Sequence, residues 1–184
     1  MKNAKLEIVI RRFTSADGST VAEIWASGLN QTVLASSWVL RPLMKWSMDY
    51  LRTSSLALEG DVGPGGINLA RYWTGKDRCF FVAERDGAVV GCCGVILGTS
   101  DGGKNDEVIV EHVVCSVWRL SVADEARLGG VGKKLMAAAE AWGQCMGCRT
   151  ITATTGNPLA KQFYQRLGFQ SMGWRAPFGY EKSL

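Results

Sequence analysis

Histidine is almost missing from this chain of 184 residues, in which His112 is the only one. A structural zinc site needs four ligands, usually two closely spaced pairs of cysteine or histidine. The six cysteines provide one such CxxC pair, Cys145 and Cys148, besides the adjacent Cys92 and Cys93. The sequence therefore favours buried free thiols over a metal or redox centre. We expect no disulfide in a reducing compartment.

Long apolar runs and an excess of one charge are also missing. No stretch of about 18 uncharged apolar residues occurs, so no membrane span is expected. The first ten residues alternate charged and apolar types and lack a signal-peptide core. The net charge is only +4, and the basic residues are dispersed, which argues against nucleic acid but suits an anionic ligand. These absences predict a cytoplasmic protein with neither a membrane nor a nucleic-acid partner.

What is present fits one α/β domain over residues 1–184, because 47% of the residues are apolar and no linker or repeat interrupts the chain. Alternation and turn signals predict strands, and 3–4 spacing predicts helices. The expected strands are 6–13, 79–84, 88–97, 108–122, 149–155 and two within 169–182. The expected helices are 21–29, 39–58, 131–146 and 157–168. Asp86-Gly87 is the hairpin turn, and Asn157-Pro158 starts the last helix.

The most informative segment, residues 121–135, reads as a strand, a short loop and a helix that starts at glycines. Its frame is Arg127-x-x-Gly130-x-Gly132, followed by Lys133 and Lys134. Glycines let backbone amides approach a ligand, and the first amides of a helix bind anions. Arg127 and Lys133 would add charge-assisted bonds. The P-loop and dinucleotide patterns both fail here, so a phosphate site or a plain tight turn remains.

This frame resembles the coenzyme A pyrophosphate motif of the GNAT superfamily of acetyltransferases. Residues 157–169, with Asn157, Ala160, Phe163, Tyr164, Gly168 and Phe169, resemble its second signature, at the right distance. The hairpin 81–91 looks like its central hairpin. Residues 78–83, 119–122 and 153–155 resemble the camello-like branch, which acetylates small amino compounds. The membrane hairpin of that branch's animal members does not occur in this sequence.

The resemblance implies an acyl-CoA N-acyltransferase fold, with a mixed, mostly antiparallel sheet of about seven strands and about four helices. It implies acetyl-CoA as cofactor and direct attack by an amine in a ternary complex. The amide of Leu120 would polarise the thioester, and Tyr164 would protonate the departing thiolate. The alternative for Tyr164 is that it is only a core aromatic. The implied cofactor-binding residues are Leu120, Val122, Arg127, Leu128, Gly129, Gly130, Val131, Gly132, Lys133, Lys134, Asn157 and Tyr164.

The sequence says less about which residues bind and deprotonate the acceptor amine. Arg119 stands out in an apolar strand; it would bind a substrate carboxylate or lie on an exposed sheet face. Glu111, His112 and Glu84 are candidate bases, and Glu111 is the working choice. In a regular strand, Trp118 and Leu120 share one face and Arg119 the other, whereas a β-bulge would exchange the faces part-way along. Lys45 and Arg52, at helical spacing with Trp46, would either line the acceptor pocket or lie on a solvated helix face, and the solvated face is the better interpretation.

We expect a small-molecule amine as acceptor, such as an amino acid or its conjugate, and leave a homodimer open. One alternative is a protein acetyltransferase acting on N-termini or lysines, which would need an open peptide groove. Another is a non-catalytic sensor that binds coenzyme A, against which the retained Tyr164 argues.

Overall fold

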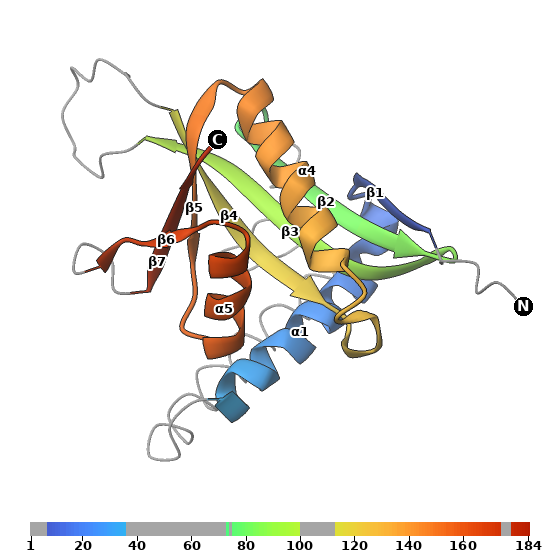
Figure 1. Cartoon of the computed structure of the whole chain (residues 1–184). Coiled ribbons are helices and arrows are strands. Elements are labelled where there is room, and N and C mark those ends of the chain that lie inside the picture. Colours follow the sequence, from blue (N-terminus) through green and yellow to red (C-terminus); the bar gives the residue numbers. More distant parts are fainter. Residues whose placement is uncertain (1–6, 36–72, 74, 100–112, 174–177) are drawn as a thin grey trace, which may run out of the picture.

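The chain folds around a seven-stranded sheet whose order is β1-β2-β3-β4-β5-β7-β6 (Figure 1). The computed structural model describes residues 7–35, 73, 75–99, 113–173 and 178–184. The strands are β1 (Ile8–Arg12), β2 (Arg78–Arg85), β3 (Ala88–Thr99), β4 (Val113–Val122), β5 (Cys148–Thr154), β6 (Gln170–Ser171) and β7 (Gly179–Ser183). The helices of four or more turns in these ranges are α1 (Gly18–Ala35) and α4 (Val131–Cys145), and α5 (Pro158–Arg166) is shorter.

Among the strands that the structure describes, only β4 and β5 pair in parallel, and every other neighbouring pair is antiparallel. The expected mixed, mostly antiparallel sheet of about seven strands is therefore confirmed. The helix expected over 39–58 lies outside the described residues, as does the start of the strand expected from 108. None of the described helices has the length and apolar character that a membrane crossing needs.

Local signals in the sequence set several boundaries. Asp86 and Gly87 both have positive φ, 54° and 78°, as a two-residue hairpin turn of type I′ requires. The side chain of Asn157 accepts a hydrogen bond from the Leu159 amide at 2.9 Å and caps α5. Gly168 follows that helix at φ 87°. The expected hairpin and the expected start of α5 are confirmed.

The start of α1 was predicted wrongly, because the cap signal lies further upstream. Asp17 accepts hydrogen bonds from the Thr14 amide at 2.8 Å and the Thr14 hydroxyl at 2.9 Å. Arg11 binds both Asp17 carboxylate oxygens at 2.8 Å. This capping box leads through a short 3₁₀ turn into a helix that begins at Gly18 rather than at 21 and continues to Ala35.

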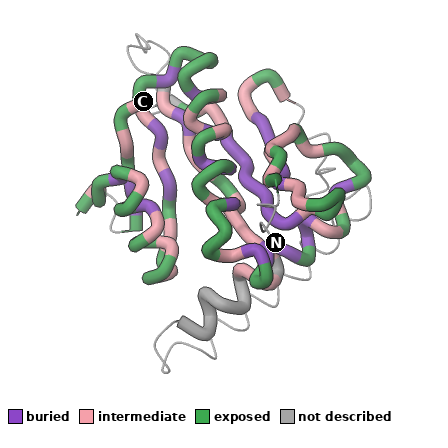
Figure 2. Tube along the Cα trace, turned by 45° about the vertical axis from the view of Figure 1, so that its right-hand side comes forward, coloured by how far each residue is buried: buried purple, intermediate pink, exposed green. Residues whose placement is uncertain are grey.

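The sheet separates two apolar layers (Figures 1 and 2). On one face, Leu135, Met136 and Ala139 of α4 and Tyr164 of α5 pack with Ile151 and its neighbours. On the other, Val21 of α1 packs with a cluster that contains Trp73, Phe80, Val82 and Cys92. In Figure 2 the buried residues gather on the strands, while the outward faces of the helices are exposed. The sheet is thus enclosed by α4 and α5 on one side and α1 on the other.

Candidate functional site

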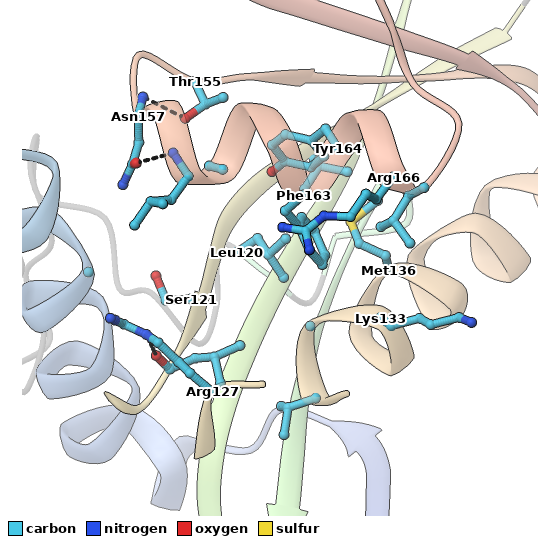
Figure 3. Close-up of a pocket in the computed structure, with 18 of the residues that line it drawn as sticks. Leu120, Ser121, Arg127, Lys133, Met136, Thr155, Asn157, Phe163, Tyr164 and Arg166 are labelled. Atoms are coloured by element: carbon cyan, nitrogen blue, oxygen red, sulfur yellow. Dashed lines mark hydrogen bonds between the residues drawn. The ribbon is translucent and has the colours of Figure 1, made fainter. Parts of the chain in front are cut away.

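The site begins where β4 and β5 separate. Their pairing starts at Val113 and Cys148 and ends at Val117 and Ala153, yet β4 continues to Val122. Residues 118–122 of β4 thus keep β3 on one side and lose β5 on the other, which leaves an open strand edge. A cavity of about 1030 Å³ lies at this opening. Its lining comes from α1, β4, α4, α5 and the loops that precede α4 and α5, together with Thr154 of β5 and Lys182 of β7 (Figure 3).

A β-bulge distorts β4 inside this opening. Cys92 of β3 pairs with Ser121 and Gly94 pairs with Trp118, so the two residues between them on β4 face a single residue of β3. Arg119, the first of the two, has a φ of 51°. Val117 before the bulge and Leu120 within it both pack with the α4 layer, although residues three apart in a regular strand face opposite sides of the sheet. Arg119 contacts Trp25 of α1 on the other side. The face assignment for a regular strand is therefore wrong here, and the alternative with a bulge is confirmed.

The loop before α4 has the geometry that its glycines suggested. Leu128 and Gly130 have φ values of 62° and 82°, and the first helical bond runs from the Lys134 amide to the Gly130 carbonyl. The amides of Val131, Gly132 and Lys133 therefore have no acceptor within the helix. The positive end of the dipole of this 15-residue helix points the same way. This end of α4 faces the cavity, so it can hold an anion there.

The basic residues of the motif point in different directions. The Arg127 guanidinium donates to the Val122 carbonyl at 3.1 Å and pairs with Asp124 at 2.7 Å, so it holds the loop against the end of β4. The Lys134 ammonium donates to the Ile8 carbonyl at 2.8 Å and does not line the cavity. Lys133 does line it. The three basic residues thus have separate positions, which the sequence alone did not distinguish.

Arg166 lines the cavity as well, and the sequence analysis missed it. Figure 3 shows its guanidinium turned back over Phe163, and its Nε donates to the Gln162 carbonyl at 3.2 Å. The available signal was helical spacing, because residues three apart on α5 share a face. Arg166 follows Phe163 by three positions and therefore reaches the same cavity.

Tyr164 belongs both to the core and to the cavity. It is only 5% exposed and packs edge-on to Phe163, tilted against Phe169 and stacked with Tyr180. It also lines the cavity, and in Figure 3 its hydroxyl points toward β4. Burial raises the pKa of the phenol above its usual value of 10.0, so Tyr164 is protonated over the physiological range. Asn157 also has two roles, because its side chain caps α5 and it lines the same cavity.

The candidate bases are not gathered in the described part of the site. Glu84 lies on β2, accepts a bond from Arg11 at 2.8 Å and does not line the cavity. Glu111 and His112 lie outside the described residues, as do Lys45 and Arg52. A carboxylate that does line the cavity, Glu140, is paired with Lys182 at 2.8 Å. The described residues therefore leave the base unassigned.

The cysteines show no sign of metal or redox chemistry in the described ranges. All six thiols are free, and no three His, Cys, Asp or Glu side chains there form a metal-binding group. Burial raises the pKa of Cys92 and of Cys115 to about 12, which keeps these thiols protonated and unreactive. Buried thiols were expected, and Cys145 is the exception because it is exposed.

Comparison with known proteins identifies the class. The family model described as an acetyltransferase (GNAT) domain matches residues 76–171, and the chain belongs to this family. An uncharacterized N-acetyltransferase of Methanocaldococcus jannaschii is 33% identical over 54% of this chain and 57% of its own length. An IAA acetyltransferase of Azospirillum brasilense is 30% identical over 56% of this chain and 61% of its own length. The chain thus spans about three fifths of these two curated relatives.

The fold is shared with solved acetyltransferases. The crystal structure of the PaiA N-acetyltransferase of Thermoplasma acidophilum, which is in complex with coenzyme A, superposes with a TM-score of 0.62 at 18% identity. The match covers 97% of this chain and all of that one. The acyltransferase fold expected from the sequence is therefore confirmed.

Proposed function

We propose that the protein is an acetyl-CoA-dependent N-acetyltransferase that acetylates the primary amine of a small molecule. One observation carries this proposal: a single cavity joins the unsatisfied amides at the start of α4 to the open edge of β4 and to Tyr164. Membership in the GNAT family supports it. The coenzyme A in the structurally similar PaiA enzyme supports the choice of cofactor.

The start of α4 suits the pyrophosphate of coenzyme A, through the amides from Leu128 to Lys133, because the Lys134 amide is bound to the Gly130 carbonyl. Lys133 and Arg166, which both line the cavity, would add charge-assisted bonds to phosphates. Arg127 would act by holding the loop in shape. The amide-bearing pantetheine arm suits the unpaired edge of β4 at Leu120 and Val122, with Asn157 across from it. The cavity volume leaves room for an acceptor beside the cofactor.

The chemistry we propose is direct attack of a neutral amine on the thioester carbon in a ternary complex. The carbonyl oxygen gains negative charge as the new C–N bond forms, and the Leu120 amide donates a hydrogen bond to it. A donor in that position contributes about 3 to 4 kcal/mol to transition-state stabilisation. Tyr164 gives its proton to the thiolate as the C–S bond breaks. Glu111 or a water chain takes the proton from the amine.

We further propose an acceptor like those of the camello-like branch, namely an amino acid or amino-acid conjugate, bound at Arg119. The free thiols support a reducing compartment such as the cytoplasm. The purified chain, acetyl-CoA and a panel of amines test the proposal when thiol release is measured. Acetylation of peptide N-termini or lysines in preference to small amines would instead favour a protein acetyltransferase. Tight coenzyme A binding without any turnover would favour a sensor.

A further inference from the structure

The cavity extends beyond the start of α4 into a groove between α4 and α5, which lie on the same face of the sheet (Figure 1). One wall of this interhelical groove consists of residues on one face of α4, namely Lys133, Met136, Ala137 and Glu140. The other wall comes from α5 and consists of Ala160, Phe163, Arg166 and Leu167. From Val131 to Glu140 the axis of α4 rises by about 13 Å. The pantetheine arm, assigned above to the open edge of β4, does not account for this groove.

The interhelical groove carries an excess of positive charge. Glu140 is the one carboxylate among the described residues that line the cavity, and it is paired with Lys182 at 2.8 Å. The ion pairs within the described part of the chain include neither Lys133 nor Arg166. Two cationic side chains therefore remain for an anionic ligand.

Arg166 lies one aromatic ring away from the start of α4. A Cβ built on Gly132 would be 3.3 Å from two atoms of the Phe163 ring, so this ring rests against the first turn of α4. Figure 3 shows the Arg166 guanidinium turned back over the same ring. Its Nε donates to the Gln162 carbonyl at 3.2 Å, which uses one of the five N–H donors of a guanidinium. The donors on its two Nη atoms thus form a second anion site, separated from the helix start by Phe163.

Coenzyme A has two anionic groups in a matching arrangement. Its ribose is joined through the 5′ oxygen to the pyrophosphate and carries a separate phosphomonoester on the 3′ oxygen, so one sugar ring lies between the two. A phosphomonoester carries close to two negative charges at neutral pH and has three acceptor oxygens. The fork of a guanidinium binds two such oxygens at once, whereas an ammonium acts as a point charge.

We infer that the interhelical groove receives the nucleotide end of the cofactor and that Arg166 is the receptor for its 3′-phosphate, while Lys133 serves the pyrophosphate. The inference rests on the proposed function, because it assigns the cofactor's second anionic group within the same cavity. It makes Arg166 a specificity-determining residue, through which the protein distinguishes coenzyme A from dephospho-coenzyme A. Ala137 and Ala160 line the groove with short side chains and leave room for the ribose and the base.

The experiment measures the binding of coenzyme A and of dephospho-coenzyme A, which lacks only the 3′-phosphate, by calorimetry. The wild type should bind coenzyme A about 10-fold more tightly, the effect of a charged hydrogen bond at an exposed site. Arg166→Ala should lose this factor for coenzyme A and leave the affinity for dephospho-coenzyme A nearly unchanged, so the two ligands bind alike. Lys133→Ala should weaken both ligands by the same factor, because both contain the pyrophosphate.

Lys161→Ala is the matched control, because it removes the same charge from an exposed position on α5 that does not line the cavity. It should preserve the preference for coenzyme A. Equal binding of the two ligands by the wild type would overturn the inference. So would an Arg166→Ala protein that weakens both ligands alike, since Arg166 would then serve the pyrophosphate or only the fold. If Arg166→Ala does not fold, Arg166→Gln makes the same comparison, and the wild-type preference needs no variant.

Turnover separates this inference from the proposed function. With any amine that is acetylated, acetyl-dephospho-CoA should have a higher KM than acetyl-CoA and a similar kcat. The expected binding preferences without acetylation of any amine would keep the 3′-phosphate receptor and overturn the acetyltransferase. Acetylation with equal binding and equal KM for the two cofactors would overturn the receptor alone.

Discussion

Gly132 lies directly against Phe163. A Cβ built on Gly132 would be 3.3 Å from two atoms of the Phe163 ring and 3.7 Å from a methyl carbon of Val122. The first turn of α4 is therefore packed on α5 and on the end of β4 at this one position. Gly132 thus has a packing requirement of its own, in addition to any phosphate that its amide binds.

Substitutions at the two motif glycines should differ in their effects on stability. Gly132→Val must displace the Phe163 ring, so it should lower both coenzyme A affinity and the melting temperature. Gly130→Ala adds a Cβ with no atom within 4 Å but at a φ of 82°. It should cost about 1 kcal/mol of stability and weaken coenzyme A binding more than that strain explains.

Gly87→Ala is the control, because Gly87 has a similar φ of 78° and equally open surroundings in the hairpin turn. It should lose similar stability and keep its affinity in calorimetry. Equal affinities for Gly130→Ala and Gly87→Ala would contradict a phosphate site at the start of α4.

Lys133 and Lys134 allow a matched pair of substitutions that tests binding to the negatively charged phosphates of the cofactor. Lys133→Ala should weaken coenzyme A binding by about 3-fold to 10-fold and reduce its dependence on salt, because one ionic contact to a phosphate is lost. Lys134→Ala removes the same charge from a side chain that is bound to the Ile8 carbonyl, and should leave affinity nearly unchanged. Titration of both variants at low and high salt makes the comparison, and equal losses would mean only a general effect of net charge.

Tyr164→Phe should lower turnover by about 10²-fold to 10⁴-fold, the range expected for loss of a general acid. Melting temperature and cofactor affinity should change little, since the ring and its packing remain. Tyr180→Phe is the control and should keep turnover near wild type. The ring centroids of Tyr180 and Tyr164 are 6.1 Å apart in a stacked arrangement, but Tyr180 does not line the cavity. Turnover near wild type in Tyr164→Phe would make Tyr164 a core aromatic only.

A second measurement separates proton donation from positioning. An acyl thioester whose leaving thiol has a lower pKa needs less protonation and should partly rescue Tyr164→Phe. A large loss without rescue would mean that Tyr164 positions the cofactor. Burial raises the pKa of Tyr164, so ionisation of this phenol should not produce an alkaline decline in turnover at ordinary assay pH.

Acid should destabilise the start of α1 through Asp17. Hydrogen bonds from Arg11 are the largest cause that lowers the pKa of Asp17 from 3.8 to about 2 in the fold. A group whose pKa is lower in the folded state stabilises the fold above its unfolded pKa. This contribution, about 2 kcal/mol from the shift, is lost as pH falls from about 4 to 2.

Asp17→Asn should therefore lower stability at pH 7 and flatten its decline over that acid range in denaturant titrations. Glu23→Gln, a change at an exposed carboxylate on α1, should do neither. An unchanged acid profile in Asp17→Asn would show that the Arg11–Asp17 pair contributes no net stability.

The elements that the sequence predicted well depend on neighbours in the chain. Asp86-Gly87 adopts the turn that its residue types favour, Asn157 caps α5, and Gly130 has the positive φ of a tight loop. A local signal for the start of α1 was also present in Thr14 and Asp17. The predicted start was wrong because it followed the apolar periodicity instead of this capping signal. These features form because one residue's φ range or side-chain acceptor is sufficient to specify them.

Other parts of the site were decided only by tertiary structure. The bulge at Arg119 arises from the pairing of β4 with β3, so the alternation of residue types along β4 alone does not specify it. The different directions of Arg127 and Lys134 depend on the carbonyls of Val122 and Ile8, and Trp25 meets Arg119 only because α1 packs on β4. The sequence by itself therefore determined the family, the tight turn at Gly130 and the capped start of α5. Which side chains meet across the cavity was determined by contacts between residues far apart in the chain, and these exist only once the sheet has formed.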